Sequence, residues 1–273
     1  MLHVFAKTTK GYAHIKDKKP CQDYSACYQD KERTIITCCD GHGGAQYIRS
    51  QLGSKMASTA VLNVLLSVTP SMIHRVKKED LENKIKLSIL CEWNRMIEEN
   101  LSKKKIRRQD LKDLDEDQID ALKINPTKAY GTTLTGALLL ENKLLVVGIG
   151  DTEVISFRKG EMTRVLEDDD DPVGNVTYSM CQEDAYSYLR VKVLDFKTLD
   201  GIILCTDGLS SPYQSYTNFN QSFIKPIVKK IYEEKNTIYI DKFIENLAKE
   251  LGNGDDVSLS FIIKDNVVKK YYK

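Results

Sequence analysis

Long hydrophobic runs are missing from this sequence of 273 residues, which excludes a membrane-spanning helix. The first residues also lack the extended apolar segment of a secretory signal, so we expect a cytoplasmic protein. An excess of one charge is missing as well, because 40 basic and 39 acidic residues leave a formal net charge of +1. A nearly neutral chain has no overall field that attracts nucleic acid or an anionic membrane, and we expect neither as a partner.

Cysteine pairs of the CxxC type are absent, although the chain has seven cysteines. Zinc-ligand spacing is therefore lacking, and a disulfide framework is not expected in a chain of this size. We expect reduced and mostly buried thiols. What the sequence does contain is a hydrophobic fraction of 41%, which is enough for a sizeable core.

Patterns of hydrophobic residues predict more strands than helices. The predicted strands cover residues 1–9, 24–28, 33–39, 132–140, 143–149, 154–158, 187–193, 202–206 and 257–263. The predicted helices cover residues 48–64, 81–101, 223–233 and 240–251. Because short turns join many strands and the helices come in pairs, we predict an α+β fold. In it, two antiparallel β-sheets pack as a central sandwich flanked by helix pairs, in α/β/β/α layers, and residues 1–273 form a single domain.

A charge-dense stretch interrupts this pattern between residues 102 and 120, with basic residues first and acidic residues after them. Such a stretch is typical of a solvated helix, and a binding surface is the alternative. We place this charged excursion at about 102–128.

Aspartates beside glycines recur where apolar strands begin or end. They are Asp40-Gly41, Gly150-Asp151, Asp207-Gly208 and Gly254-Asp255-Asp256. One such pair is simply a turn signal. Four carboxylates at strand ends could instead meet at one rim of a sandwich, where they would repel one another and have raised pKa values. A hard divalent cation removes that conflict, and oxygen ligands without cysteine or paired histidine favour magnesium or manganese over zinc.

The glycines and the histidine next to these aspartates also suit a divalent metal site. A glycine has no Cβ to obstruct an ion, and its carbonyl oxygen is a further ligand. Two ions that share a carboxylate could activate a bridging water at neutral pH. His42, two residues after Asp40, is then placed to donate a proton to a leaving group, while a histidine that only caps the turn is the alternative.

These elements resemble the signature of the metal-dependent PPM-type (type 2C) protein serine/threonine phosphatases. The string Cys39-Asp40-Gly41-His42-Gly43-Gly44 is similar to the DGHGG segment of that family. Five further segments stand in the family's order: Pro20-Cys21-Gln22-Asp23, Gly131-Thr132-Thr133, Gly150-Asp151-Thr152, Cys205-Thr206-Asp207-Gly208-Leu209 and Asp255-Asp256-Val257-Ser258. The resemblance spans residues 1–264, and several elements in order are far more specific than DGHGG alone.

The resemblance implies a β-sandwich flanked by helices, with two Mn²⁺ or Mg²⁺ ions per site at its edge. Asp40 would bridge the ions, and Gly41 would offer its carbonyl oxygen. Asp207 and Asp255 would hold the first ion, and Asp23 would organise the second. The additional ligands or supports would be Asp151 and Asp256.

The implied reaction is hydrolysis of phosphoserine or phosphothreonine in a protein substrate by direct attack of a metal-bridging water. His42 and Asp40 would be the catalytic residues, with His42 protonating the departing oxygen. We expect a monomer whose partner is its phosphoprotein substrate.

Three positions depart from the family's pattern. Lys18 stands where many members have an arginine that grips the phosphate, so it is the candidate phosphate-binding residue, with charge but without the bidentate fork. Gln22 replaces a glutamate, which would alter the water network around the second ion. Ser211 stands where some members have an aspartate for a third ion, so a third site is not expected.

Lys18 and Gln22 keep an alternative function open, a catalytically weak or inactive phosphatase-like binding module, against which the retention of Asp40 and His42 argues. A two-metal nuclease is disfavoured by the near-zero net charge. An acidic run at residues 168–171 lies where the family has a variable flap, at about 165–186. This run either screens substrates electrostatically or forms a solvated loop.

Overall fold

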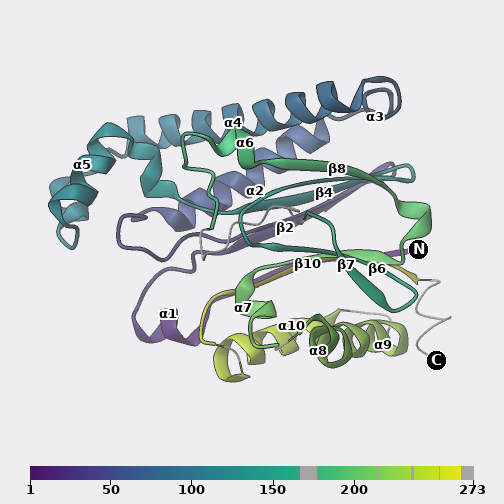
Figure 1. Ribbon diagram of the computed structural model, residues 1–273. Helices are drawn as coiled ribbons and strands as arrows, with labels where there is room; N and C mark the ends of the chain where they lie inside the picture. The colour runs from purple at the N-terminus through teal and green to yellow at the C-terminus, as the bar shows by residue number, and fades with distance from the viewer. Residues whose placement is uncertain (167–176, 214, 235–236, 252, 266–273) are drawn as a thin grey trace.

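The structure is a computed structural model that describes residues 1–166, 177–213, 215–234, 237–251 and 253–265. Its strands form two five-stranded sheets in which all neighbours pair antiparallel (Figure 1). The order in the first sheet is β1 (Leu2–Thr9), β10 (Val257–Lys264), β9 (Gly201–Cys205), β6 (Glu153–Arg158) and β7 (Glu161–Arg164). The order in the second sheet is β2 (Tyr24–Gln29), β3 (Arg33–Cys39), β4 (Leu134–Leu140), β5 (Lys143–Ile149) and β8 (Arg190–Asp195).

Helices cover the outer face of each sheet (Figure 1). The long helices α2 (Ser50–Leu66) and α4 (Lys78–Lys103) lie on the second sheet, and α9 (Lys225–Glu234) and α10 (Ile238–Asn246) lie on the first. The shorter helices are α1 (Tyr12–Lys16), α3 (Pro70–Arg75), α5 (Glu116–Ile124), α6 (Ala185–Tyr188), α7 (Asp207–Ser210) and α8 (Tyr216–Phe219). The predicted sandwich with helices on both sides is therefore confirmed.

Three hydrophobic clusters hold the four layers together, one between the sheets and one between each sheet and its helices. Strand β10 shows how the sequence produces them, because successive side chains of a strand point to opposite faces. Phe261 and Ile263 belong to the cluster under α9 and α10, whereas Ile262 belongs to the cluster between the sheets. In β3, Ile35 and Ile36 divide in the same way between the helix side and the inter-sheet side. Strands buried on both faces require such continuous apolar runs.

Two strands differ most from the sequence prediction. The strand expected at 187–193 starts later, because residues Ala185–Tyr188 form helix α6 and β8 covers Arg190–Asp195. Ala185 and Leu189 are both buried and lie four residues apart, a spacing that suits one face of a helical turn and not a strand. Strand β7 has no apolar alternation to reveal it, since most of its four residues are exposed.

The charged excursion contains helix α5. Asp115 is the N-cap of this helix, because its side chain accepts a hydrogen bond from the backbone N–H of Gln118 at 2.8 Å. The acidic run at 168–171 lies outside the described residues. At the two ends of the predicted flap, where the structure describes the chain, buried side chains such as Leu166 and Met180 belong to the core.

A helix with the length and the hydrophobicity needed to span a membrane is not found in the described ranges.

Candidate metal centre

The aspartates singled out by the sequence lie at one end of the two sheets. In the second sheet, Tyr24 pairs with Cys39, so Asp23 just before β2 and Asp40 just after β3 fall at the same edge. In the first sheet, β9 and β10 run antiparallel, so Asp207 just after β9 falls at the edge where β10 begins. Antiparallel pairing therefore gathers residues from distant parts of the sequence.

Thr206 connects the two sheets at this edge. Its hydroxyl Oγ1 donates a hydrogen bond to Asp23 Oδ2 at 2.8 Å and accepts one from the backbone N–H of Ser258 at 3.0 Å. Asp23 is 6% exposed and belongs to the second sheet's edge, whereas Thr206 and Ser258 belong to the first. Thr206 thus fixes the position of Asp23, a role that no feature of the sequence alone indicates.

The carboxylates at this edge raise one another's pKa. Burial and the charge of Asp256 hold the pKa of Asp23 well above its ordinary value. Burial and the charges of Asp23 and Asp207 do the same for the pKa of Asp40. The pKa of Asp207 is also raised, by burial and by the charges of nearby carboxylates, although a hydrogen bond with the Asp40 carboxyl partly opposes the shift. The cluster therefore carries more negative charge than its surroundings stabilise.

A divalent cation would compensate the charge of these carboxylates. Within the described parts of the chain, no lysine or arginine makes a hydrogen bond or ion pair with Asp23, Asp40, Asp207 or Asp255. Each of these residues offers carboxylate oxygens, which are the ligands that Mg²⁺ and Mn²⁺ prefer. The oxygen-rich metal site that the sequence predicts would remove this excess of charge, and it stays a prediction.

Glycines allow the strand ends to approach this closely. A Cβ on Gly208 would lie 2.0 Å from the carbonyl oxygen of Asp256, and a Cβ on Gly41 would lie 2.5 Å from the carbonyl oxygen of Gln22. Real Cβ atoms do not come so near to backbone atoms. Gly41 and Gly208 are therefore required for the close packing of these backbones.

His42 lies beside the cluster with its ring against Tyr47, at 4.8 Å between ring centroids. Burial lowers the pKa of His42, and the charge of Asp151 partly opposes that effect. Its backbone N–H bonds to the carbonyl of Gly131 at 3.1 Å, and its ring makes no hydrogen bond to the described residues. Among the described residues no hydrogen bond holds the ring at the turn, and its role as a proton donor stays a prediction.

Asp151 and Lys18 are both exposed to solvent. Asp151 is exposed and accepts a hydrogen bond from Thr177 Oγ1 at 2.7 Å, while its charge affects the pKa of Asp40, His42 and Asp207. Lys18 is exposed in the turn after α1, with a left-handed backbone (φ 55°). Its role in binding phosphate stays a prediction.

Gln22 and Ser211, two of the residues that depart from the family's pattern, form hydrogen bonds to neighbouring residues. The side-chain amide of Gln22 donates to the carbonyl of His42 at 3.0 Å and to Ser50 Oγ, so it ties the loop before β2 to the loop after β3. Ser211 accepts a hydrogen bond from Asn253 at 3.0 Å. It supplies no carboxylate for a third ion.

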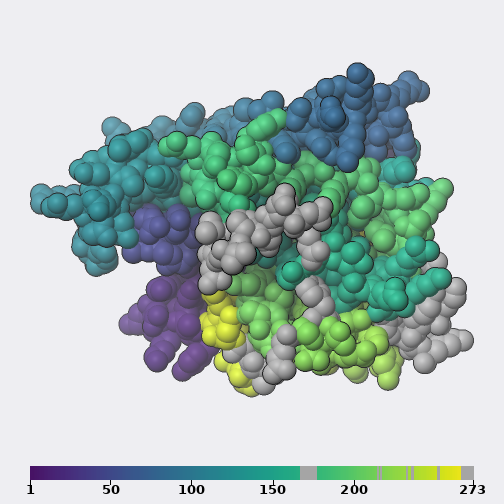
Figure 2. Space-filling model, viewed as in Figure 1, coloured from purple at the N-terminus to yellow at the C-terminus, as the bar shows by residue number. Residues whose placement is uncertain are grey.

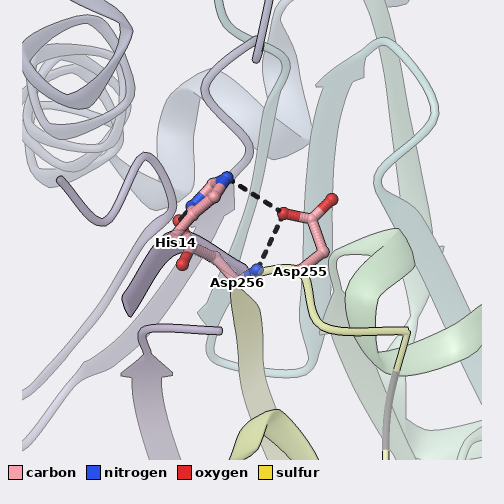
Figure 3. Close-up of side chains that lie close together, drawn as sticks. All are labelled: His14, Asp255 and Asp256. Carbon is pink, nitrogen blue, oxygen red and sulfur yellow. Dashed lines mark hydrogen bonds and ion pairs between the residues drawn. The ribbon is translucent and has the colours of Figure 1, made fainter. Parts of the chain in front are cut away.

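Asp255 and Asp256, at the start of β10, differ in their surroundings. Asp255 is exposed, whereas Asp256 is buried and bonded to the backbone N–H groups of Gly11 at 2.8 Å and Gln22 at 2.6 Å. Both carboxylates also approach His14, a residue that the sequence analysis does not single out. In the described chain, ligand atoms of these three side chains form a group in which all lie within 4.8 Å of one another (Figure 3).

Comparisons with known proteins agree with this fold. Residues 10–248 match the family model of protein phosphatase 2C, and the chain belongs to that family. The serine/threonine phosphatase of S. agalactiae is similar to 96% of this chain and 99% of its own, at 17% identity and a TM-score of 0.63. Stp1 from Staphylococcus aureus covers 97% of this chain and 95% of its own, at 14% identity and a TM-score of 0.62.

A third similar structure is the catalytic domain of the serine/threonine phosphatase PstP, solved in complex with two manganese ions. The similarity covers 96% of this chain and 97% of that one, at 18% identity and a TM-score of 0.55. No curated protein sequence matches the chain. At these identities the structural likeness establishes the fold. The family match identifies the chain as a protein serine/threonine phosphatase.

Proposed function

We propose that this phosphatase is metal-dependent and removes phosphate from phosphoserine and phosphothreonine in a protein substrate without a phosphoenzyme. The observation that carries the proposal is the group of carboxylates at one sheet edge, which raise one another's pKa and have no lysine or arginine partner among the described residues. We further propose that the enzyme acts as a monomer in the cytoplasm.

The residues that would hold two Mn²⁺ or Mg²⁺ ions are Asp23, Asp40, Gly41 through its carbonyl oxygen, Asp207 and Asp255. When bound, such ions neutralise phosphate charge and activate a water for direct attack on phosphorus. The chain's own part is to keep the carboxylates in place. Thr206 does so for Asp23, and the hydroxyl of Thr133, which accepts the backbone N–H of Asp40 at 2.9 Å, does so for Asp40.

The proposal is tested with phosphoserine and phosphothreonine peptides and the purified chain. We expect hydrolysis to rise with added Mn²⁺ and to stop when EDTA removes the metal. Asp207→Asn should lose the response to Mn²⁺ because the variant lacks one carboxylate of the cluster. Turnover that is indifferent to EDTA would contradict metal dependence, and peptide binding without any turnover would support the alternative of a binding module.

His42 is proposed to protonate the departing seryl or threonyl oxygen. We expect His42→Asn to lower the hydrolysis of a phosphoserine peptide by about 100-fold or more, as for the loss of a general acid. The loss should be much smaller with p-nitrophenyl phosphate, because its leaving group departs as a stable anion. An equal loss on both substrates would contradict proton donation and would instead indicate a role in positioning the phosphate.

A further inference from the structure

The ring of His14 is brought to the start of β10 by the other end of the chain. Helix α1 places it there, and the backbone N–H of Ala13 donates to the carbonyl of Gly254 at 2.8 Å. Gly11 allows this approach, since a Cβ at that position would lie 2.1 Å from the carbonyl oxygen of Asp255. On the molecular surface the purple segment near the N-terminus lies directly against the yellow segment near the end of the described chain (Figure 2).

Asp256 fixes which nitrogen of His14 carries a hydrogen. Its side chain is 1% exposed and receives hydrogen bonds from the backbone of Gly11 and of Gln22, and it lies 2.8 Å from His14 Nδ1. A carboxylate can only accept, so Nδ1 is the donor. In the neutral ring this leaves an unshared electron pair on Nε2.

That Nε2 atom faces Asp255 Oδ1 at 3.7 Å (Figure 3). The distance is too long for a hydrogen bond, and Oδ1 already accepts the backbone N–H of Asp256 at 2.8 Å. Two atoms that bind one transition-metal ion lie no more than about 4 Å apart, since each bond is about 2.1 Å long. Asp255 is 49% exposed on its side chain, so an ion can reach this position.

We propose that His14 Nε2 and Asp255 Oδ1 bind the same divalent transition metal, so that the ion at Asp255 has one imidazole ligand. The proposal rests on the proposed function, which places an ion at Asp255. Asp256 acts as the outer partner that orients the ring, as carboxylates commonly do behind a metal-binding histidine. A nitrogen ligand favours transition metals over Mg²⁺, so His14 makes this position selective for Mn²⁺ over Mg²⁺.

The test is electron spin echo envelope modulation of the full chain loaded with Mn²⁺, which detects a nitrogen bonded directly to the metal. We expect the nitrogen signal in the unaltered protein and its loss in His14→Asn. The shorter amide of this variant can still donate to Asp256 from the place of Nδ1 but has no nitrogen electron pair to offer. The matched control is His74→Asn, because His74 is exposed on α3 beside Glu141, and this variant should keep the signal.

Metal competition gives a second readout. We expect His14→Asn to lose about tenfold or more of its preference for Mn²⁺ over Mg²⁺, because changes even to outer partners of a metal cost about 10–100-fold and this variant lacks the nitrogen ligand itself. Bound Mn²⁺ without a nitrogen signal, or a signal lost only in His42→Asn, would overturn the assignment of His14 and leave metal-dependent hydrolysis standing. A chain that binds no Mn²⁺ and hydrolyses phosphopeptides in EDTA would overturn both proposals.

Discussion

Replacing Asp40 by asparagine is expected to abolish phosphatase activity while making the metal-free protein more stable. Asp40 is the carboxylate whose pKa is raised by burial and by the charges of Asp23, Asp207, Asp151 and Asp255. The variant removes a proposed metal ligand, so hydrolysis in Mn²⁺ should fall by about 100-fold or more. It also removes a repelled charge and leaves an amide that can donate to Asp207. We therefore expect a gain of about 1 kcal/mol in the free energy of unfolding, or about 2 °C in Tm.

The opposite signs of these two effects make the experiment informative. The matched control is Asp113→Asn, because this side chain is 83% exposed in the charged excursion. The control should change neither the hydrolysis of a phosphopeptide nor the Tm measured by calorimetry in EDTA. If Asp40→Asn instead lowered both the activity and the stability, Asp40 would be a structural residue, and the account of a repulsive metal-binding cluster would be wrong.

Replacing Gly208 by alanine is expected to lower the free energy of unfolding more than the other substitutions proposed above. The new Cβ would lie 2.0 Å from the carbonyl oxygen of Asp256 and 3.6 Å from the Cβ of Asp255. Because the nearest atom belongs to the backbone, the strand end itself must move. Overpacking of this kind costs about 1–3 kcal/mol, which corresponds to a fall in Tm of roughly 2–10 °C in thermal unfolding. Movement of the start of β10 should also remove the response to Mn²⁺.

Gly43→Ala is the matched control within the DGHGG segment. Its Cβ would meet only the side-chain oxygen of Gln22, at 3.9 Å, which is ordinary contact. We expect its stability to stay within about 0.5 kcal/mol of the unaltered protein. A Gly208→Ala variant that unfolds at the same temperature as Gly43→Ala would show that the two strand ends are not packed as closely as described.

The sequence predicts the architecture well because its signals are local. Apolar runs such as the one in β10 mark strands buried on both faces, and several of them begin or end beside an Asp and a Gly at one sheet edge. The regularity of α2 and α4 is also visible as hydrophobic periodicity. Strand β7 and helix α6 are not predicted, since four residues are too few to show a period.

The site is predicted less completely because its supports come from distant positions. The contact between His14 and Asp256 joins residues 242 positions apart, and the one between Thr206 and Asp23 joins residues 183 positions apart. Neither pair has a local pattern, so only the folded chain reveals them. The sequence suggests a use for these glycines beside an ion, but the close contact between backbones depends on which strands become neighbours.

The central claim is that Asp40 and its neighbouring carboxylates bind divalent cations. Its most direct test is anomalous X-ray diffraction at the manganese edge from crystals of the full chain saturated with Mn²⁺. The account predicts two manganese peaks within bonding distance of the Asp40 carboxylate, one of them shared with Asp207. A crystal of active protein with no manganese bonded to Asp40 would contradict it.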